Sequence, residues 1–370
     1  MSKLKLVFWS PCPNPHLGPL FVELFQSGID IKVMYESPLD TSRSSSGWQK
    51  RRLDERYECL GLTPEWKSQI PDWQERVHII PGFGSPFLRG VVVRLTLSGC
   101  QWIFLGEGPN RRRRWAYLAK RPLRKLFAFC INRYALGALA IGAIAEKEFL
   151  NWGVRREKIG FLSYTPDVRT QVVTGQPKLT RFVFVGQMIE LKNVGLLLRA
   201  FSAITLENGV SSPSLHLYGD GPDRPKYEDL SRLLGLGDKV FFHGVVAHDC
   251  LMARLSGASV LVLPSEEDGW GAVLNEAAQA GLALVASSNC GAAHHLIKPG
   301  VNGFRFESGD LIGLRRCLQA YTTQPSLAVQ HGQESQRISE AYLPAPQAHE
   351  LLRQIQSWLA LAKNQNESRG

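Results

Sequence analysis

The chain has 370 residues, 44% hydrophobic and 21% charged, which is an ordinary composition for a soluble globular protein with room for two domains. No stretch is long enough to span a membrane, and the apolar part of KLKLVFWS is interrupted at once by PCPNP, unlike a signal peptide. The seven cysteines form no CxxC pair, which argues against a disulfide or zinc framework. We therefore expect a cytoplasmic protein.

Short apolar segments alternate with helical patterns along most of the chain, which predicts an α/β fold with parallel sheets wrapped by helices. In the first half we expect strands at 3–10, 30–37, 76–82, 100–106, 138–144 and 158–164. In the second half we expect them at 181–187, 214–220, 239–244, 259–265, 282–288 and 302–307.

Composition also suggests how the chain divides. We expect an N-terminal domain over 1–167, a polar linker over 168–180, a second domain over 181–345, and a C-terminal helix with a frayed tail over 346–370. The fraying should begin after Ser357. Residues 38–72 are polar and irregular, and we expect them to form a mobile loop over the first domain.

The positive charge is concentrated in the first half of the chain. Residues 1–170 contain 26 Lys and Arg against 15 Asp and Glu, whereas residues 171–370 contain 17 against 18. The densest part is the aromatic-containing segment 111–129, which could contact an anionic membrane, a phosphorylated acceptor or nucleic acid, or could be a solvated helix face. Its basic residues are Arg111, Arg112, Arg113, Arg114, Lys120, Arg121, Arg124 and Lys125.

The most informative segment is PSEEDGWGAVLNEAA at 264–278, where a buried strand is followed by a helix. In an open parallel sheet, ligands bind at the carboxyl ends of strands, and a helix start offers unpaired N–H groups to an anion. Gly269 and Gly271 would allow close approach to this backbone. Asp268 has an alternative role, because Asp before a helix is a favoured N-cap.

Two other features indicate a ligand site near the same crevice. Glu276 lies on a helix of small apolar residues, and a carboxylate can accept hydrogen bonds from both ribose hydroxyls, although a Glu on a helix is usually only solvated. Lys192 is at the start of a predicted helix, where the helix dipole disfavours a cation unless an anion is bound. The turn LYGDGPDR (217–224) is a weak signal by itself.

With these motifs on one chain, the second half resembles the donor-binding domain of retaining GT-B glycosyltransferases of family 4, the glycosyl transferases group 1. The resemblance covers VFVGQMIELKNVGLLLRAF, LHLYGDGP, VFFHG, the segment around 264–278 and GVNGF, in the family's order. It implies two Rossmann-like domains facing a cleft. It also implies a donor site made of Gln187, Lys192, Gly269, Trp270, Gly271, Ala272, Val273 and Glu276.

The resemblance implies that Glu276 hydrogen-bonds the ribose hydroxyls and that Asp268 faces the donor sugar. It also implies that Lys192 and the backbone N–H groups of the Gly269–Val273 turn contact the diphosphate. Asp268 stands where Glu is usual, and Gln187 where many members have Arg, which leaves the catalytic role of Asp268 open. Where members carry a histidine after the fourth strand, this chain reads FLGEGP, so Glu107 is one further catalytic candidate and His16 is another.

The resemblance implies a metal-independent, hexosyltransferase-like enzyme that moves a sugar from a nucleotide diphosphate sugar to a glycan or lipid-linked acceptor, with retention. Such enzymes act in lipopolysaccharide, capsule or exopolysaccharide synthesis. We expect no cofactor, no metal and no nucleic acid partner, since the sequence has no DxD pair or His/Cys cluster. We also expect peripheral attachment to the inner face of the plasma membrane through 111–125. The alternatives are a sugar-nucleotide epimerase of the same fold and a non-catalytic polyanion- or membrane-binding protein.

Overall fold

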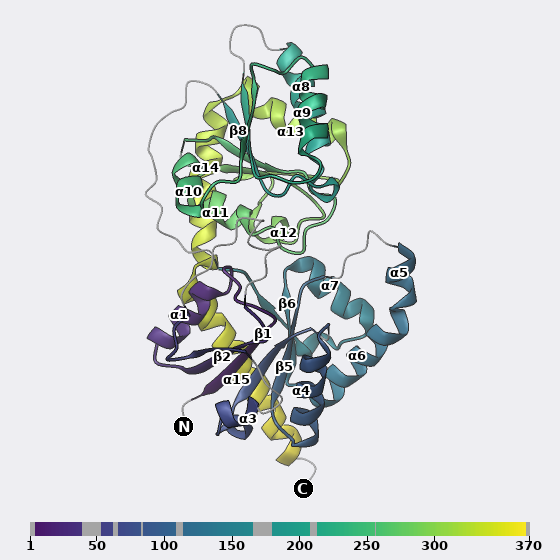
Figure 1. Ribbon diagram of the computed structural model, residues 1–370, viewed down its shortest axis with the longest axis vertical. Coiled ribbons are helices and arrows are strands. Elements are labelled where there is room, and N and C mark those ends of the chain that lie inside the picture. Colours follow the sequence, from purple (N-terminus) through teal and green to yellow (C-terminus); the bar gives the residue numbers. More distant parts are fainter. Residues whose placement is uncertain are drawn as a thin grey trace. The chain divides into compact units, whose positions relative to one another are not determined.

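The computed structural model describes residues 4–38, 53–61, 66–82, 84–108, 114–165, 180–207, 213–255 and 257–367. They form two compact units (Figure 1). The first unit consists of the described residues up to 165 together with those from Leu343 onward, and the second runs from 180 to Tyr342. The predicted linker over 168–180 lies outside the described residues except for Thr180.

The first unit is built on a parallel sheet of seven strands in the order β3-β2-β1-β4-β5-β6-β7. Its strands are β1 (Lys5–Ser10), β2 (Asp30–Tyr35), β3 (Glu58–Leu60), β4 (Val77–Pro81), β5 (Trp102–Gly106), β6 (Gly137–Ile141) and β7 (Ile159–Leu162). Its helices are α1 (Gly18–Gln26), α3 (Trp66–Gln69), α4 (Pro86–Leu97), α5 (Arg114–Ala119), α6 (Arg121–Tyr134), α7 (Ala143–Trp152) and α15 (Pro344–Glu367).

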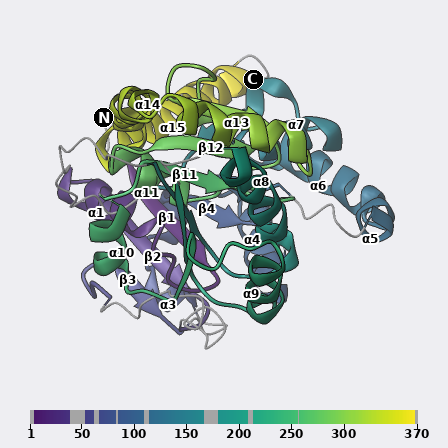
Figure 2. The same cartoon turned by 90° about the horizontal axis from the view of Figure 1, so that it is seen from above.

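The second unit is built on a parallel sheet of six strands in the order β10-β9-β8-β11-β12-β13. Its strands are β8 (Arg181–Val185), β9 (Ser214–Tyr218), β10 (Val240–Gly244), β11 (Val260–Leu263), β12 (Ala283–Ser287) and β13 (Gly303–Phe306). Its helices are α8 (Val194–Glu207), α9 (Arg224–Leu233), α10 (His248–Leu255), α11 (Val273–Gln279), α12 (Ala293–Leu296), α13 (Leu311–Thr323) and α14 (Ser326–Ser339). In Figure 2, α8 and α9 lie on one side of this sheet and α10 and α11 on the other.

The predicted fold class is confirmed, because the two parallel α/β sheets form two Rossmann-like domains. Each of the twelve predicted strands is present within a few residues of its expected position. Every residue of β6, β11 and β12 is buried. Strands covered on both faces are continuous apolar runs, which is why the sequence located them well.

The prediction of a mobile loop over 38–72 is wrong for the part that the structure describes. Strand β3 extends the first sheet beside β2, and the short helix α3 follows it. Trp66 and Ile70 are almost fully buried, and the Trp66 ring meets Trp9 edge to face at 5.0 Å between ring centroids. Burial of these large side chains orders a segment whose composition is otherwise polar.

The C-terminal helix α15 belongs to the first unit, where it packs on α1 and β7. The Gln354 amide bonds both backbone groups of Phe161, accepting from its N–H at 2.7 Å and donating to its carbonyl at 2.9 Å. The Trp358 ring lies so close to Gly137 that a Cβ there would be 2.6 Å from the ring. The helix continues to Glu367, past the predicted fraying point at Ser357, because strong helix formers occupy 359–363.

We predict that Trp358→Ala lowers the free energy of unfolding of the first unit by about 3 kcal/mol, since the buried indole would leave a cavity over β6 and β7. Leu361→Ala on the same helix is the control, because 47% of Leu361 is exposed. Urea titration followed by circular dichroism measures both variants. Equal midpoints for the two variants would contradict the docking of α15.

Candidate functional site

The loops that follow β8 and β11 lie side by side in the second unit, because these strands are parallel neighbours and both loops leave the same edge of the sheet. The backbone N–H of Glu266 donates to the carbonyl of Leu191 at 2.9 Å. Next to this bond, Lys192 Nζ donates to Asp268 Oδ2 at 2.6 Å. The structure thus brings together two residues that the sequence analysis selected independently.

The Lys192–Asp268 ion pair is largely shielded from water, with exposed side-chain fractions of 20% and 15%. Partial burial strengthens a charge pair compared with one on the open surface. Lys192 ends a short 3-10 turn (Glu190–Lys192), and the left-handed conformation of Asn193 (φ 49°) then starts α8. Asp268 does not cap α11, whose N-cap is Ala272 without a side-chain cap bond. The N-cap alternative for Asp268 is therefore wrong.

Trp270 has its side chain inside the protein. It is 1% exposed, and its indole N–H donates to Asn275 Oδ1 at 2.7 Å. Its carbonyl accepts hydrogen bonds from the Cys290 thiol and from the N–H of Ala292. Burial raises the pKa of Cys290, and the charge of Asp268 raises it further, so this thiol stays protonated. Trp270 therefore anchors the turn with its side chain and its carbonyl.

The start of α11 presents backbone donors and a carboxylate together. In the described part of the chain, no backbone or side-chain acceptor bonds the N–H groups of Gly271, Ala272 and Val273. Gly271 has φ +88°, and a Cβ there would be 2.5 Å from the Cys290 sulfur, so glycine is required. Glu276 lies on the first turn of α11 and is partly exposed. This arrangement suits an anion beside a hydroxyl-bearing group.

The loop after β9 packs backbone against backbone on the loop after β8. A Cβ on Gly219 would be 2.0 Å from the carbonyl oxygen of Gly186, and one on Gly221 would be 2.5 Å from that of Met188. Gln187 is exposed between these contacts. The glycines of LYGDGP, a weak signal in the sequence, are therefore needed to bring the two strand ends together.

The described ranges contain no group of three or more His, Cys, Asp or Glu side chains placed to hold a metal ion. The charged groups of the second-unit site include the Lys192 ammonium and the carboxylates of Asp268 and Glu276.

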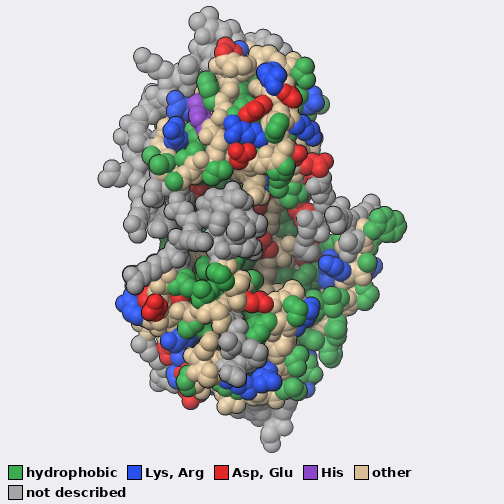
Figure 3. All heavy atoms as spheres, viewed as in Figure 1, with side chains coloured by type: hydrophobic (Ala, Val, Ile, Leu, Met, Phe, Trp, Pro, Cys, Tyr) green, Lys and Arg blue, Asp and Glu red, His purple; other side chains and the backbone are tan. Residues whose placement is uncertain are grey.

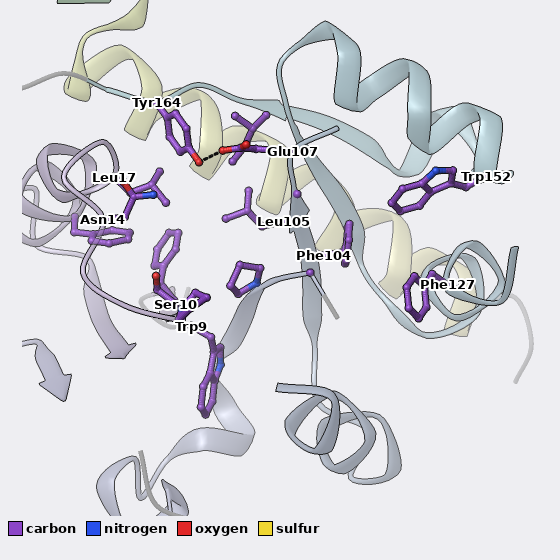
Figure 4. A pocket seen from close by; sticks show the side chains of 17 residues that line it. Trp9, Ser10, Asn14, Leu17, Phe104, Leu105, Glu107, Phe127, Trp152 and Tyr164 are labelled. Carbon is purple, nitrogen blue, oxygen red and sulfur yellow. Dashed lines mark hydrogen bonds between the residues drawn. The ribbon is translucent and has the colours of Figure 1, made fainter. Parts of the chain in front are cut away.

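The first unit contains a pocket of about 380 Å³ at the carboxyl ends of β1, β4, β5 and β6 (Figure 4). Its lining residues are Phe8, Trp9, Ser10, Pro11, Asn14, Leu17, Phe21, Pro81, Gly82, Phe104, Leu105, Gly106, Glu107, Phe127, Ile141, Trp152 and Tyr164. The Tyr164 hydroxyl donates to Glu107 Oε1, and the His16 ring lies 5.4 Å from the Tyr164 ring between centroids. Glu107 and His16 are thus linked through Tyr164, which the sequence analysis did not select.

A buried histidine fixes one wall of this pocket. His78 Nδ1 accepts a hydrogen bond from the indole N–H of Trp9 at 3.1 Å, and His78 Nε2 lies 2.7 Å from the carbonyl of Trp73. Burial lowers the pKa of His78 to about 4, so the ring is neutral at neutral pH, with its proton on Nε2. His78 therefore positions Trp9 and lies behind the pocket wall.

The basic segment is divided between structural and exposed residues. Arg124 is 8% exposed, its guanidinium lies 3.8 Å from the Tyr117 ring centroid, and its Nη1 donates to the Tyr117 carbonyl. The expectation that Arg124 contacts an acceptor or membrane is therefore wrong, because this side chain holds α5 on α6. Lys120, Arg121 and Lys125 are exposed. Arg111, Arg112 and Arg113 lie outside the described residues, as does the side chain of Arg114.

Large apolar side chains are exposed beside these cations, and Figure 3 shows them gathered over α5 and α6. Trp115 is 86% exposed and Phe129 59% exposed. The others are Leu118, Leu123 and Leu126. We call these five residues the α5–α6 apolar face. Among the described residues, no helix has both the length and the apolar character needed to cross a bilayer.

Comparison with known proteins places these sites in context. The family described as glycosyl transferases group 1 matches residues 180–322. The lipopolysaccharide 1,6-galactosyltransferase of Escherichia coli (strain K12) is 24% identical over 210 residues, covering 55% of this chain and 57% of that protein. The D-inositol 3-phosphate glycosyltransferase of Streptomyces avermitilis is 29% identical over 171 residues, covering 43% and 36%. The matched part spans about half the length, or less, of these relatives.

Solved structures extend the likeness to both units. An apo lipopolysaccharide outer core galactosyltransferase, WaaB, matches with a TM-score of 0.73 and 18% identity, covering 96% of this chain and 99% of that one. Anabaena HepE in complex with UDP matches with a TM-score of 0.73 and 15% identity, covering 96% and 100%. Residues 180–322 therefore match the group 1 glycosyl transferases, and the two units have the GT-B fold of the similar solved structures.

Proposed function

We propose that this protein is a retaining glycosyltransferase that moves a hexose from a nucleotide diphosphate sugar to a glycan or lipid-linked acceptor. The observation that carries the proposal is the shielded Lys192–Asp268 pair between the loops after β8 and β11, inside the segment that matches the family. A cation and unpaired N–H groups at the carboxyl ends of parallel strands are suited to a diphosphate.

In this proposal Lys192 and the N–H groups of Gly271 to Val273 hold the diphosphate, and Glu276 accepts hydrogen bonds from the ribose hydroxyls. Asp268 keeps the Lys192 ammonium in place before the donor binds. When the diphosphate departs it gains negative charge, and a preorganised cation at that point lowers the barrier. Asp268 then faces the donor sugar while remaining beside Lys192.

The identity of the donor and the pathway in which the enzyme acts are also proposals. Two similar structures are described with UDP and glucose or with UDP-glucose, so UDP-hexoses are the first donors to test. The similar relatives include a lipopolysaccharide galactosyltransferase and inositol phosphate glycosyltransferases, whose acceptors differ. We favour cell-surface polysaccharide synthesis, because the α5–α6 apolar face and the cations beside it suit an acceptor presented at a membrane.

We also propose that this enzyme works at the anionic inner face of the plasma membrane. The α5–α6 apolar face would enter the headgroup region, and Lys120, Arg121 and Lys125 would meet lipid phosphates. The distribution of charge alone placed the membrane contact at 111–125, and the exposed apolar side chains extend it to Phe129. A nucleic acid would bind the cations and would not need exposed apolar side chains. The α5–α6 apolar face therefore favours a bilayer over a nucleic acid.

An epimerase of the same fold and a non-catalytic polyanion-binding protein are the rival functions. An epimerase would convert the sugar nucleotide without any acceptor, and a polyanion-binding protein would bind in a salt-dependent way without turnover. Product analysis with and without acceptor separates the three.

We predict that Lys192→Ala lowers kcat/KM for the sugar nucleotide by about a hundredfold, because the departing diphosphate loses its cation. Glu276→Ala should mainly abolish the thermal stabilisation that the donor gives. Lys226→Ala, an exposed lysine on α9, is the matched control and should behave as wild type. Wild-type binding of no sugar nucleotide, or unchanged binding in Glu276→Ala, would contradict the assignment.

Because Lys192 and backbone N–H groups would carry the diphosphate charge, we expect the initial rate to be unchanged after dialysis against EDTA and to gain nothing from added Mg²⁺ or Mn²⁺. Nucleotide release is the measurement. A rate that disappears with EDTA and returns with Mg²⁺ would refute the metal-independent mechanism.

For membrane attachment we predict that Leu126→Gln with Phe129→Gln abolishes co-sedimentation with vesicles containing phosphatidylglycerol, while Arg111–Arg114→Gln weakens it in a salt-dependent manner. Leu233→Gln, an exposed leucine of the second unit, is the control. Binding that survives both sets of substitutions would exclude this surface as the contact.

A further inference from the structure

Two histidines lie side by side on the second sheet. His216 belongs to β9, and His243 belongs to β10, the terminal strand of that sheet. His216 Nδ1 lies 2.9 Å from His243 Nε2, so one ring nitrogen donates its proton to the lone pair of the other. His243 is exposed and His216 is partly exposed, which places the pair at the surface of the second unit.

A β-bulge in β10 brings His243 to this position. The pairing of β10 with β9 shifts between Phe242 and Gly244, and His243 is the extra residue between them. Bulges at the edge of a sheet re-aim a side chain. The His243 ring stacks on Tyr218, with 4.5 Å between the centroids and 11° between the planes, and its Nε2 faces His216.

The ring of His216 is oriented by two further contacts. Its Nε2 lies 3.2 Å from Ser214 Oγ, and its ring stacks on Phe241 with 4.8 Å between the centroids. When Nε2–H donates to the serine hydroxyl, the lone pair is on Nδ1, the nitrogen that faces His243. A hydrogen bond to the outer ring nitrogen is the feature that orients histidine ligands in metal sites.

Both imidazoles are neutral at neutral pH. Burial lowers the pKa of His216 to about 4, and nearby positive charges lower it further. Burial also lowers the pKa of His243. The charges of Arg181 and Arg254 act on both rings. A neutral imidazole is the form that binds a transition metal.

The two arginines restrict the class of ion that can bind. Their charge disfavours any cation, so the ion must have a strong intrinsic affinity for imidazole. Zn²⁺, Ni²⁺ and Cu²⁺ have this affinity, whereas Mg²⁺ and Ca²⁺ require oxygen ligands. An anion would be attracted by Arg181 and Arg254, but two neutral imidazoles would add no charge to hold it.

We infer that His216 Nδ1 and His243 Nε2 together bind one divalent transition metal ion. The ion replaces the hydrogen bond between the rings. The proton of that bond moves to His243 Nδ1, so both ligands stay neutral and no proton is released. Water completes the coordination, and the binding is therefore weaker than at a site with three or four protein ligands. The bound ion cross-links β10 to β9 at the edge of the sheet.

The test is isothermal titration calorimetry at neutral pH with NiCl₂ and ZnCl₂, on the full chain without a histidine tag. We expect one Ni²⁺ or Zn²⁺ to bind at this site, and MgCl₂ to give no binding. His216→Asn and His243→Asn should each abolish the binding. His349→Asn, which changes an exposed histidine of α15, is the matched control and should bind as wild type.

Three further variants separate this site from its alternatives. Ser214→Ala should weaken Ni²⁺ binding about tenfold, because His216 loses the partner of its outer nitrogen. Arg254→Gln should tighten the binding, because it removes a repelling charge. Cys250→Ser, which removes an exposed thiol of α10, should leave the binding unchanged. Thermal unfolding without metal shows that each variant is folded, and added Ni²⁺ should raise the unfolding temperature of wild type but not of the two histidine variants.

Unchanged Ni²⁺ affinity in both histidine variants, loss of binding in Cys250→Ser, or no binding at millimolar metal would each overturn the inference. Binding of inorganic phosphate that Arg254→Gln removes, without any binding of metal, would assign the cluster to an anion instead. The titration needs neither donor nor acceptor, so its failure leaves the proposed transfer reaction standing. Equally, a failure of sugar transfer would leave the metal site standing.

Discussion

Parallel pairing of the strands is the constraint on which both sites depend. In each sheet every strand runs in the same direction as its neighbours, so the loops that follow the strands all leave at one edge. Lys192 and Asp268 are distant in sequence but meet because β8 and β11 are neighbours. In the same way, the successive strands β1, β4, β5 and β6 of the first sheet end at residues that line one pocket, namely Ser10, Pro81, Gly106 and Ile141.

The sequence predicted the strands well because buried parallel strands are continuous apolar runs, and β6 and β12 are examples. It missed β3, which has only three residues, and the order that Trp66 imposes on a polar segment. The sequence also did not predict whether a given side chain points to the surface or into the core. Arg124 was expected at an acceptor or membrane surface, but its contact with Tyr117 holds it inside. The sequence also did not show that the Trp270 side chain is buried, where it bonds Asn275.

The charge of the first unit and the chemistry of its pocket are separate properties. A count of basic residues indicated an anionic partner, and the exposed cations of α5 and α6 still favour one. The pocket itself has a carboxylate and aromatic rings. Electrostatic attraction would therefore act at the surface of α5 and α6, whereas hydrogen bonds and ring contacts would govern binding in the pocket.

The position of α15 affects the order in which the chain folds during synthesis. The described part of the second unit is a single stretch of sequence, 180–342, so it can complete its core once residue 342 has left the ribosome. The first sheet is made earlier, yet Gly137, Gly160 and the backbone groups of Phe161 stay uncovered until residues 344–367 emerge. During that interval β7 is an unprotected edge strand, the kind of surface on which nascent chains aggregate or recruit chaperones.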